Sequence, residues 1–218
     1  MITDERFVTY IRSLEKPNSE ILTKIEQEAH KDLVPIIRKE MESFSRVILN
    51  IKHPKEILEL GTAIGYSAIL MSEACDAKIT TIENYEKRIP IARENFAKAG
   101  KQDQIELLEG DALEVMKTLP EAKYDFIFMD AAKAQYINYL PEVMRLLTPG
   151  GVLITDNVLQ DGDLIQSKFV VRRRDRTIHN RMREFLEEIK HDDRLETSIV
   201  PIGDGIVMAV KKNSRKLD

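Results

Sequence analysis

Acidic and amide side chains follow two predicted strands at the points where those strands end. Asp130 follows the apolar run that begins at Tyr124, and Asp156 and Asn157 follow the run that begins at Val152. Parallel strands joined by helices place their carboxyl ends at one edge of a sheet, where ligands bind. Each of these side chains could instead cap a loop or a helix. Together they supply only oxygen ligands and two negative charges, which predicts a Mg²⁺ or Mn²⁺ site formed by Asp130, Asp156 and Asn157.

Asp156 and Asn157 are consecutive, and this sets a geometric condition on the predicted metal site. In an extended strand, consecutive side chains point to opposite faces of the sheet. Both side chains can bind one ion only if the chain turns at this point. We therefore expect the strand to end by about Asp156 and the turn to direct both side chains toward Asp130.

A glycine-bearing turn after the first predicted strand indicates a second binding site. Gly61 and Gly65 lie in the segment Glu59–Ser67, between an apolar run and an apolar helix. Glycines let the backbone approach a ligand closely, although a tight turn without a ligand is the alternative. The spacing Gly-x-x-x-Gly lacks the Gly-x-Gly-x-x-Gly pattern that presents amides to a pyrophosphate. A nucleoside ligand without phosphates therefore fits better than NAD.

Acidic residues at the next two strand ends fit the same kind of ligand. Glu83 ends the second predicted strand, where a carboxylate can accept hydrogen bonds from both hydroxyls of a ribose. Asp111, which precedes Ala112, follows the third strand and can accept a hydrogen bond from an adenine amino group. Asp111 can equally be the N-cap of the helix that runs through Met116. The sequence leaves both roles of Asp111 open.

The elements that must position these residues are short apolar runs that alternate with amphipathic helices. This alternation predicts βαβ units, and the Gly-Asp-Gly of residues 203–205 predicts a tight reversal between two antiparallel strands. The predicted fold class is α/β: a Rossmann-like, seven-stranded, mostly parallel sheet with an antiparallel last strand, plus N-terminal helices. We expect strands at Glu56–Leu60, Ile79–Glu83, Ile105–Leu108, Tyr124–Asp130, Val152–Thr155, Glu196–Val200 and Ile206–Val210.

The N-terminal region shows helical spacing of apolar residues, and we expect helices near Thr3–Asn50. The third of these helices is predicted to open near Pro35, a residue tolerated in a first turn, and to end at His53-Pro54. A chain of 218 residues suits a single domain over 1–218, with a helical segment at about 1–52.

Composition excludes several classes of protein. The net charge of -4 argues against a protein that coats nucleic acid with its whole surface. The single cysteine, Cys75, excludes an internal disulfide framework and a zinc site built from several thiolates. The acidic N-terminus does not resemble a signal peptide, and no run reaches the ~18 apolar residues of a membrane-spanning helix. We therefore expect a soluble, cytoplasmic protein that has no membrane partner.

Positive charge is concentrated in one segment between the fifth predicted strand and the final pair. Such a run is usually a solvated helix face, but arginine also suits phosphates because its planar fork donates two hydrogen bonds. An acidic protein with one basic loop near its site suggests a local contact with RNA, and nothing in the segment reads a base sequence. The cations are Lys168, Arg172, Arg173, Arg174, Arg176, Arg181 and Arg183.

The glycine turn and the two acidic strand ends together resemble the cation-dependent class I O-methyltransferase family, which includes catechol and caffeoyl-CoA O-methyltransferases. The resemblance covers roughly Ile37 to Val210. It implies that Asp130, Asp156 and Asn157 hold Mg²⁺ or Mn²⁺, that Asp130 takes part in catalysis, and that Ser67 meets the carboxylate of S-adenosylmethionine. The implied contacts of this cofactor are Ile37, Glu59, Gly61, Ser67, Glu83, Asp111, Ala112 and Asp130.

The resemblance also implies that Lys133 acts near the reacting hydroxyl as a base. A lysine must be partly neutral to accept a proton, whereas a charged lysine can only steer the oxyanion, and both roles remain open. The segment Asp130–Lys133 reads Asp-Ala-Ala-Lys, where plant and animal members typically show Asp-Ala-Asp-Lys. Ala132 leaves the ligand set intact but argues against assuming the same substrates.

Four segments are most similar to the bacterial tRNA 5-hydroxyuridine methyltransferases: Gly61–Ser67, Asp130–Lys133, Thr155–Leu159 and Pro201–Gly205. The similarity implies methylation of the 5-hydroxyl of a wobble uridine, with the tRNA anticodon loop as partner, no DNA, and a homodimer. The 5-hydroxyl and the neighbouring O4 could chelate a metal as a catechol does.

The expected tRNA contacts are Lys168, Arg172, Arg173, Arg174 and Arg176. One alternative is an enzyme that methylates a small catechol or phenol. Another is a nucleotide-binding domain without catalysis, which the set Asp130, Lys133, Asp156 and Asn157 disfavours because binding alone does not need it.

Overall fold

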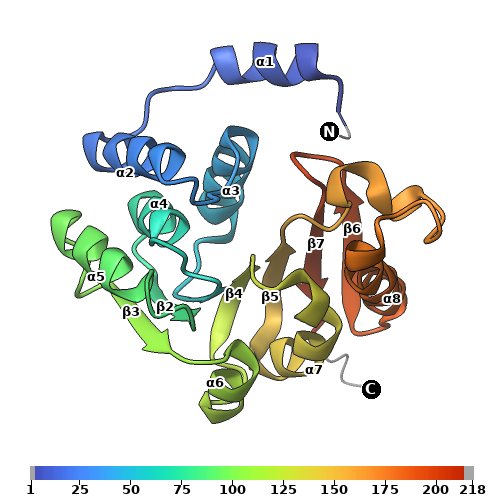
Figure 1. Ribbon diagram of the computed structural model, residues 1–218. Helices are drawn as coiled ribbons and strands as arrows, with labels where there is room; N and C mark the ends of the chain where they lie inside the picture. Colours follow the sequence, from blue (N-terminus) through green and yellow to red (C-terminus); the bar gives the residue numbers. More distant parts are fainter. Residues whose placement is uncertain (1–2, 214–218) are drawn as a thin grey trace. The chain divides into compact units, whose positions relative to one another are not determined.

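The computed structural model describes residues 3–213 and places their strands in one sheet of order β3-β2-β1-β4-β5-β7-β6 (Figure 1). β2 pairs in parallel with β1 and β3, and β5 pairs in parallel with β4, whereas β7 runs antiparallel to both β5 and β6. The predicted mostly parallel, seven-stranded sheet with an antiparallel last strand is confirmed. The strands are β1 Glu56–Leu60, β2 Lys78–Glu83, β3 Ile105–Glu109, β4 Tyr124–Met129, β5 Leu147–Thr155, β6 Leu195–Val200 and β7 Ile206–Lys211.

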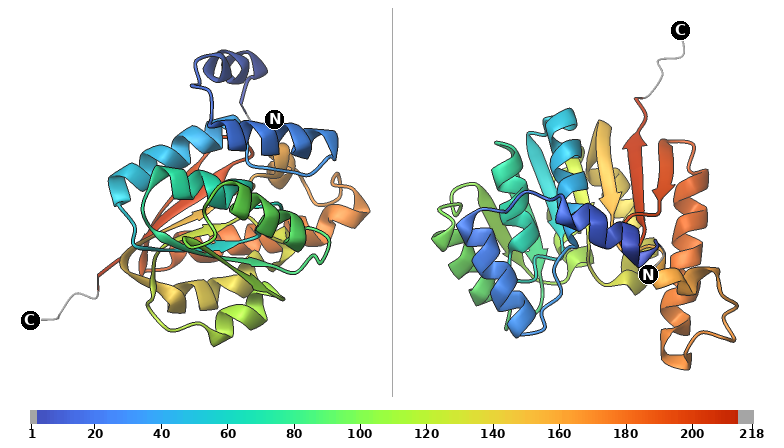
Figure 2. Two further views of the ribbon diagram at one scale, coloured as in Figure 1. Left: turned by 90° about the vertical axis from the view of Figure 1, so that its left-hand side faces the viewer. Right: turned by 90° about the horizontal axis from the view of Figure 1, so that it is seen from above.

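The described residues divide into two compact units. The first unit covers residues 4–115, and in it α2 and α3 pack beside α4, while α4 and α5 pack against β3 (Figure 2). β1 is buried at four consecutive positions, which is typical of a parallel strand covered on both faces. The helices of this unit are α1 Glu5–Ser13, α2 Glu20–Lys31, α3 Lys39–Lys52, α4 Tyr66–Ala74 and α5 Ile89–Lys98, and α6 Ala112–Thr118 begins in it.

The start of α3 differs from the prediction. The helix begins at Lys39 and not near Pro35, because the first helical hydrogen bonds are accepted by the carbonyl of Arg38. The residues from Pro35 to Arg38 lie outside regular secondary structure, and the side chain of Ile37 is buried. Pro35 therefore does not start the helix, and the segment before Lys39 buries the side chain of Ile37 instead. The predicted end is confirmed, since His53 caps the helix in the left-handed conformation.

The second unit comprises Thr3 and residues 116–213. Its long helix α8 (Arg176–His191) packs against β6 and against α7 (Tyr136–Leu146), and it buries Met182, Phe185 and Ile189 at helical spacing. Short 3₁₀ turns, η1 Lys133–Gln135, η2 Gln160–Ile165 and η3 Arg173–Asp175, connect these elements. No helix within residues 3–213 has the length and apolar character needed to cross a membrane.

β5 starts earlier than predicted, at Leu147 instead of Val152. Leu147 pairs with Tyr124 and Val152 pairs with Phe126, so the Pro149-Gly150-Gly151 stretch forms an irregularity inside the strand. Proline and glycine at these positions indicate a turn in the sequence, whereas the pairing of Leu147 depends on a neighbouring strand. The other predicted strands agree with the structure to within one residue at each end.

Candidate active site

Asp130 and Asp156 lie at the carboxyl ends of the paired strands β4 and β5. Met129 is in register with Thr155, so the two aspartates follow neighbouring strand ends. The backbone N–H of Asp156 donates to the carbonyl of Met129 at 3.0 Å, and the side chain of Asp156 is buried. β5 ends at Thr155, which confirms the prediction that the strand ends by about Asp156.

The chain turns at Asn157, as the predicted metal site requires. Asn157 has a left-handed backbone with φ of 59°, a conformation that asparagine tolerates better than most residues. Its backbone N–H donates to the Asp156 carboxylate at 2.7 Å. The turn is confirmed, and the direction of the Asn157 amide toward Asp130 stays a prediction.

The two carboxylates are electrostatically strained. Burial and the nearby charge of Asp130 raise the pKa of Asp156 to about 7, and the Lys133 ammonium opposes this only in part. Burial also raises the pKa of Asp130, again against the effect of Lys133. A divalent cation would stabilise this site, because a buried and a half-buried acid have too little positive charge beside them.

The residues present fit such a cation. Two carboxylates and an amide form an all-oxygen donor set, which suits Mg²⁺ or Mn²⁺. The buried hydroxyl of Thr155, at the end of β5, and the buried side-chain nitrogen of Gln160, in η2, have no hydrogen-bond partner among the described residues. No group of three or more His, Cys, Asp or Glu within residues 3–213 could hold an ion, and the predicted set contains only two such residues.

Two further side chains belong to this region, and the sequence did not single them out. Tyr136 is fully buried, and its hydroxyl donates to the Asp156 carbonyl at 3.2 Å. Burial and the charges of Asp130 and Asp156 raise the pKa of Tyr136 well above its usual value. Asp204, in the turn between β6 and β7, lies 3.9 Å from Lys133 (Oδ2 to Nζ). The sequence shows Asp204 only as part of a tight reversal, and the position of Tyr136 three residues after Lys133 carries no signal of its own.

The basic segment divides into cations that hold the fold and cations that do not. Arg176 donates to the carbonyls of Phe169 and Val171, Arg181 to that of Ala134, and Arg183 to that of Leu164. The ammonium of Lys168 lies over the ring of Phe169, and Arg174 pairs with Asp175. Arg172 and Arg173 are exposed, and their side chains form no hydrogen bond or ion pair with the described residues. These two arginines have no such partner, and the exposed Lys168 and Arg174 also remain open to solvent.

In the first unit, the glycine turn between β1 and α4 has the backbone that its glycines predict. Gly61 and Gly65 have φ of 99° and 86°. A Cβ at Gly65 would lie 2.5 Å from Cε1 of Phe96, so no larger residue fits without displacing that ring. The amide of Asn95 donates to the carbonyl of Ile64 at 2.8 Å, which fixes the turn from inside the unit. This is a rigid cradle at the start of a helix, as a cofactor site needs.

Glu59 is fully buried at the strand side of this cradle. Its carboxylate accepts hydrogen bonds from the hydroxyls of Ser67 and Thr81, both at 2.5 Å. Because Ser67 donates its proton to Glu59, only a rotated hydroxyl could donate to the carboxylate of a cofactor. The roles of Glu59 and Ser67 toward a cofactor stay predictions.

Glu83 and Asp111 both hold backbone amides. The Glu83 carboxylate accepts from the N–H groups of Ala63, Asn84 and Tyr85, at 2.7, 3.0 and 2.9 Å. An ionised carboxylate has about four acceptor sites, so room remains for one ribose hydroxyl. Asp111 accepts from two N–H groups in the first turn of α6, which confirms that it caps this helix. Binding of adenine by Asp111, and contacts of Ile37 and Ala112, both buried, stay predictions.

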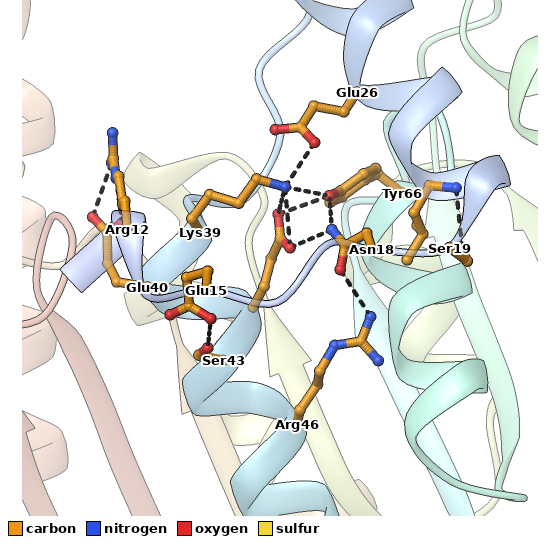
Figure 3. Close-up of polar contacts among 12 residues, drawn as sticks. Arg12, Glu15, Asn18, Ser19, Glu26, Lys39, Glu40, Ser43, Arg46 and Tyr66 are labelled. Atoms are coloured by element: carbon orange, nitrogen blue, oxygen red, sulfur yellow. Dashed lines mark hydrogen bonds and ion pairs between the residues drawn. The ribbon is translucent and has the colours of Figure 1, made fainter. Parts of the chain in front are cut away.

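A buried polar network fixes the first residue of α4 to the N-terminal helices (Figure 3). The hydroxyl of Tyr66 donates to Glu42 at 2.7 Å and accepts from the amide of Asn18 at 3.0 Å. Lys39 forms ion pairs with Glu42 at 3.2 Å and with Glu26 at 2.6 Å. Burial and the Glu42 hydrogen bond raise the pKa of Tyr66 above its usual range, so its proton stays in place. The network joins α2 and α3 to the residue next to Ser67.

The comparisons with known proteins agree with this geometry. The sequence profile of the O-methyltransferase family matches residues 12–212. Caffeoyl-CoA O-methyltransferase 5 of Nicotiana tabacum is 34% identical over 177 residues, which cover 76% of this chain and 72% of the relative. Catechol O-methyltransferase of Niastella koreensis is 34% identical over 127 residues, which cover 56% of this chain and 58% of the relative.

A solved structure extends the likeness to the fold. The O-methyltransferase of Bacillus cereus, in complex with SAH, has a TM-score of 0.82 and 27% identity over 94% of this chain and 96% of its own. The family profile spans nearly all of the described residues, and the fold matches a cofactor-product complex of the same type. The chain belongs to the O-methyltransferase family, whose members use S-adenosylmethionine.

Proposed function

We propose that this protein transfers a methyl group from S-adenosylmethionine to a hydroxyl oxygen that has a second oxygen beside it, with the help of a divalent metal ion. The observation that carries the proposal is the pair of carboxylates, the buried Asp156 and the half-buried Asp130, at neighbouring strand ends. A cation bound there would relieve their mutual repulsion when both are ionised. A cation held there would have open positions for two adjacent oxygens of an acceptor.

The residues of this chain divide the work by their chemistry. Asp130, Asp156 and Asn157 would hold the ion, which when bound supplies charge that stabilises the acceptor as an oxyanion. Lys133 places its ammonium near the two carboxylates, where it can steer that oxyanion. Tyr136 keeps its proton and fixes the backbone of Asp156. The glycine turn, Glu59 and Glu83 would orient the cofactor, and no covalent intermediate with the protein is needed.

A small catechol or phenol is the acceptor that the named relatives support. Caffeoyl-CoA and catechol O-methyltransferases bear the names of substrates with a catechol unit, and both are more than 30% identical to this chain over their aligned parts. A catechol offers the two adjacent oxygens that the site chemistry requires. Ala132, at the position where plant and animal members typically show aspartate, argues against assuming the same substrate.

The 5-hydroxyl of a wobble 5-hydroxyuridine in tRNA is the second acceptor, and the basic segment favours it. Arg172 and Arg173 are exposed and face no acid in the described residues, so they are available to phosphates. The O4 of the uracil would provide the neighbouring oxygen. An unpaired anticodon base can enter a site without melting a duplex.

One experiment separates the two acceptors. Purified protein is incubated with S-adenosylmethionine and Mg²⁺, with either a panel of catechols and phenols or tRNA that carries 5-hydroxyuridine. Mass spectrometry then measures methylated phenol or 5-methoxyuridine. Product from one acceptor and not the other identifies the substrate class. Product from neither, or full product in excess EDTA, would overturn the proposal, and heat-denatured protein provides the control.

A further inference from the structure

The loop that follows Asp156 and begins with Asn157 holds an unusual number of left-handed residues. Asn157, Gln160 and Asp161 have φ of 59°, 51° and 51°, and none of them is glycine. Such conformations cost free energy and persist only where the surroundings impose them. Something outside the loop must therefore hold residues 157–161 in this shape.

The turn between β6 and β7 does so. The N–H groups of Val158 and Leu159 donate to the carbonyls of Gly205 and Asp204, at 2.8 and 2.9 Å. The N–H of Asp161 donates to the carboxylate oxygen Oδ1 of Asp204. A Cβ at Gly205 would lie 2.3 Å from Cγ of Leu159, so the loop and the turn are in close contact. The side chain of Asp204 is the only one of these acceptors that a substitution can remove.

The other oxygen of the same carboxylate faces the lysine of the candidate active site. Oδ2 of Asp204 lies 3.9 Å from Nζ of Lys133, and the Asp204 side chain is buried whereas that of Lys133 is about one-third exposed. Lys133 follows β4, and the held loop follows β5. One buried carboxylate thus joins the segments that follow two neighbouring strands, and the negative charge of Asp204 also reaches Asp156.

We propose that Asp204 is a positioning residue for methyl transfer: it holds the Lys133 ammonium beside Asp130 and Asp156 and, through the Asp161 amide, fixes the loop that follows Asp156 and carries Asn157. Asp204 is not a metal ligand in this arrangement, since it forms no ion-binding group with the other described acids. The inference rests on the function proposed above, because it concerns the reaction at that same site.

A double-mutant cycle tests the link to Lys133. Asp204→Asn keeps the size and an oxygen acceptor for the Asp161 N–H, but it removes the charge that faces Lys133. We expect kcat to fall about 10- to 100-fold, the usual effect of losing a partner that orients an active-site group, with KM for S-adenosylmethionine nearly unchanged. Lys133→Met should lower kcat as well, and the double variant should be no slower than Lys133→Met alone.

The matched control is Asp163→Asn, an exposed acid two residues after this loop, which should leave kcat as in the parent. Two results would overturn the proposal. One is an unchanged kcat for Asp204→Asn. The other is a double variant whose loss of kcat is the product of the two single losses, because Asp204 then acts independently of Lys133.

Two structural readouts apply whether or not an acceptor is methylated. Hydrogen exchange should show that the Asp161 amide is protected in the parent and in Asp204→Asn and loses protection in Asp204→Ala. The side-chain NMR signals of Lys133, assigned with Lys133→Met, should shift in Asp204→Asn and not in Asp163→Asn. If the parent is inactive but both changes are seen, the proposed function is rejected and the contacts of Asp204 with Lys133 and the Asp161 amide are supported. Unchanged exchange and unchanged signals reject the positioning role even in an active enzyme.

Discussion

The raised pKa of Asp156 predicts that the metal-free protein is more stable in mild acid than in mild base. Burial and the charge of Asp130 raise this pKa from 3.8 to about 7. The folded state therefore holds the Asp156 proton more tightly than the unfolded chain does. Ionising Asp156 costs more in the folded protein, so the free energy of unfolding rises as the pH falls through about 7 and levels off below the unfolded pKa of about 3.8.

The size of the effect follows from the two pKa values. The cost of the ionised, buried Asp156 is roughly 4 kcal/mol above about pH 8 and roughly half of that at about pH 5.5. We therefore expect the free energy of unfolding to increase by about 2 kcal/mol between these conditions, after subtraction of the same change in Asp156→Asn. Mg²⁺ should stabilise the parent most at the higher pH, where the Asp156 carboxylate is ionised.

Urea unfolding in EDTA, followed by circular dichroism at both pH values, measures this difference. Asp163→Asn, at an exposed position, should behave like the parent. The reasoning fails if the parent and Asp156→Asn lose the same free energy of unfolding between about pH 5.5 and pH 8.5. It also fails if millimolar Mg²⁺ stabilises Asp156→Asn as much as it stabilises the parent.

Four further predictions test other parts of the site. Chelation with EDTA, or Asp130→Ala, should abolish methyl transfer and leave SAH affinity, measured by calorimetry, nearly intact, whereas a large loss of SAH affinity would contradict the separation of the two functions. Glu83→Ala should weaken SAH binding by about 1–3 kcal/mol, because three backbone amides and the ribose lose their acceptor. Glu109→Ala, at an exposed strand end, is the control and should leave SAH binding unchanged. Tyr66→Phe should lower the free energy of unfolding by about 1–3 kcal/mol, since Glu42 and Asn18 lose a buried partner, and the exposed Tyr85→Phe should not. If tRNA is the acceptor, replacing Arg172 and Arg173 with alanine should reduce the slope of log Kd for tRNA against log salt by about 2, and an unchanged slope would show that neither arginine meets a phosphate.

Much of the sheet could be predicted because its strands carry their own signal. β1 spans Glu56–Leu60 as predicted, since a short apolar run bounded by polar residues suffices to define a buried parallel strand. The first part of β5 could not be predicted in this way. Leu147 joins the strand because Tyr124 of β4 lies opposite it, while the intervening proline and glycines indicate a turn when read alone. The local preference of these residues favours a turn, whereas pairing with β4 favours a strand, and the structure shows the strand.

Some residues of the candidate site also carry a local sequence signal, and others do not. Asp130, Asp156 and Glu83 could be predicted because acidic residues at strand ends follow from the period of the βαβ pattern. Asp204 and Tyr66 could not, because their partners are far along the chain. The Asp161 amide is 43 positions from Asp204, and Asn18 is 48 positions from Tyr66. Only the folded chain brings these side chains together, so no local spacing reveals them.

The charge of the basic segment shows why a count of cations overstates what a ligand can use. Three guanidinium groups, those of Arg176, Arg181 and Arg183, donate hydrogen bonds to backbone carbonyls. Buried or half-buried carbonyls require such a donor. Arg176 and Arg183 thereby hold residues between β5 and α8, and Arg181 holds η1, which follows β4. If Arg172 and Arg173 alone meet phosphates, they release about two counterions, which supports only weak, salt-sensitive binding. An RNA acceptor would therefore have to gain most of its affinity from the methylated base itself, whereas a small catechol would not need these arginines at all.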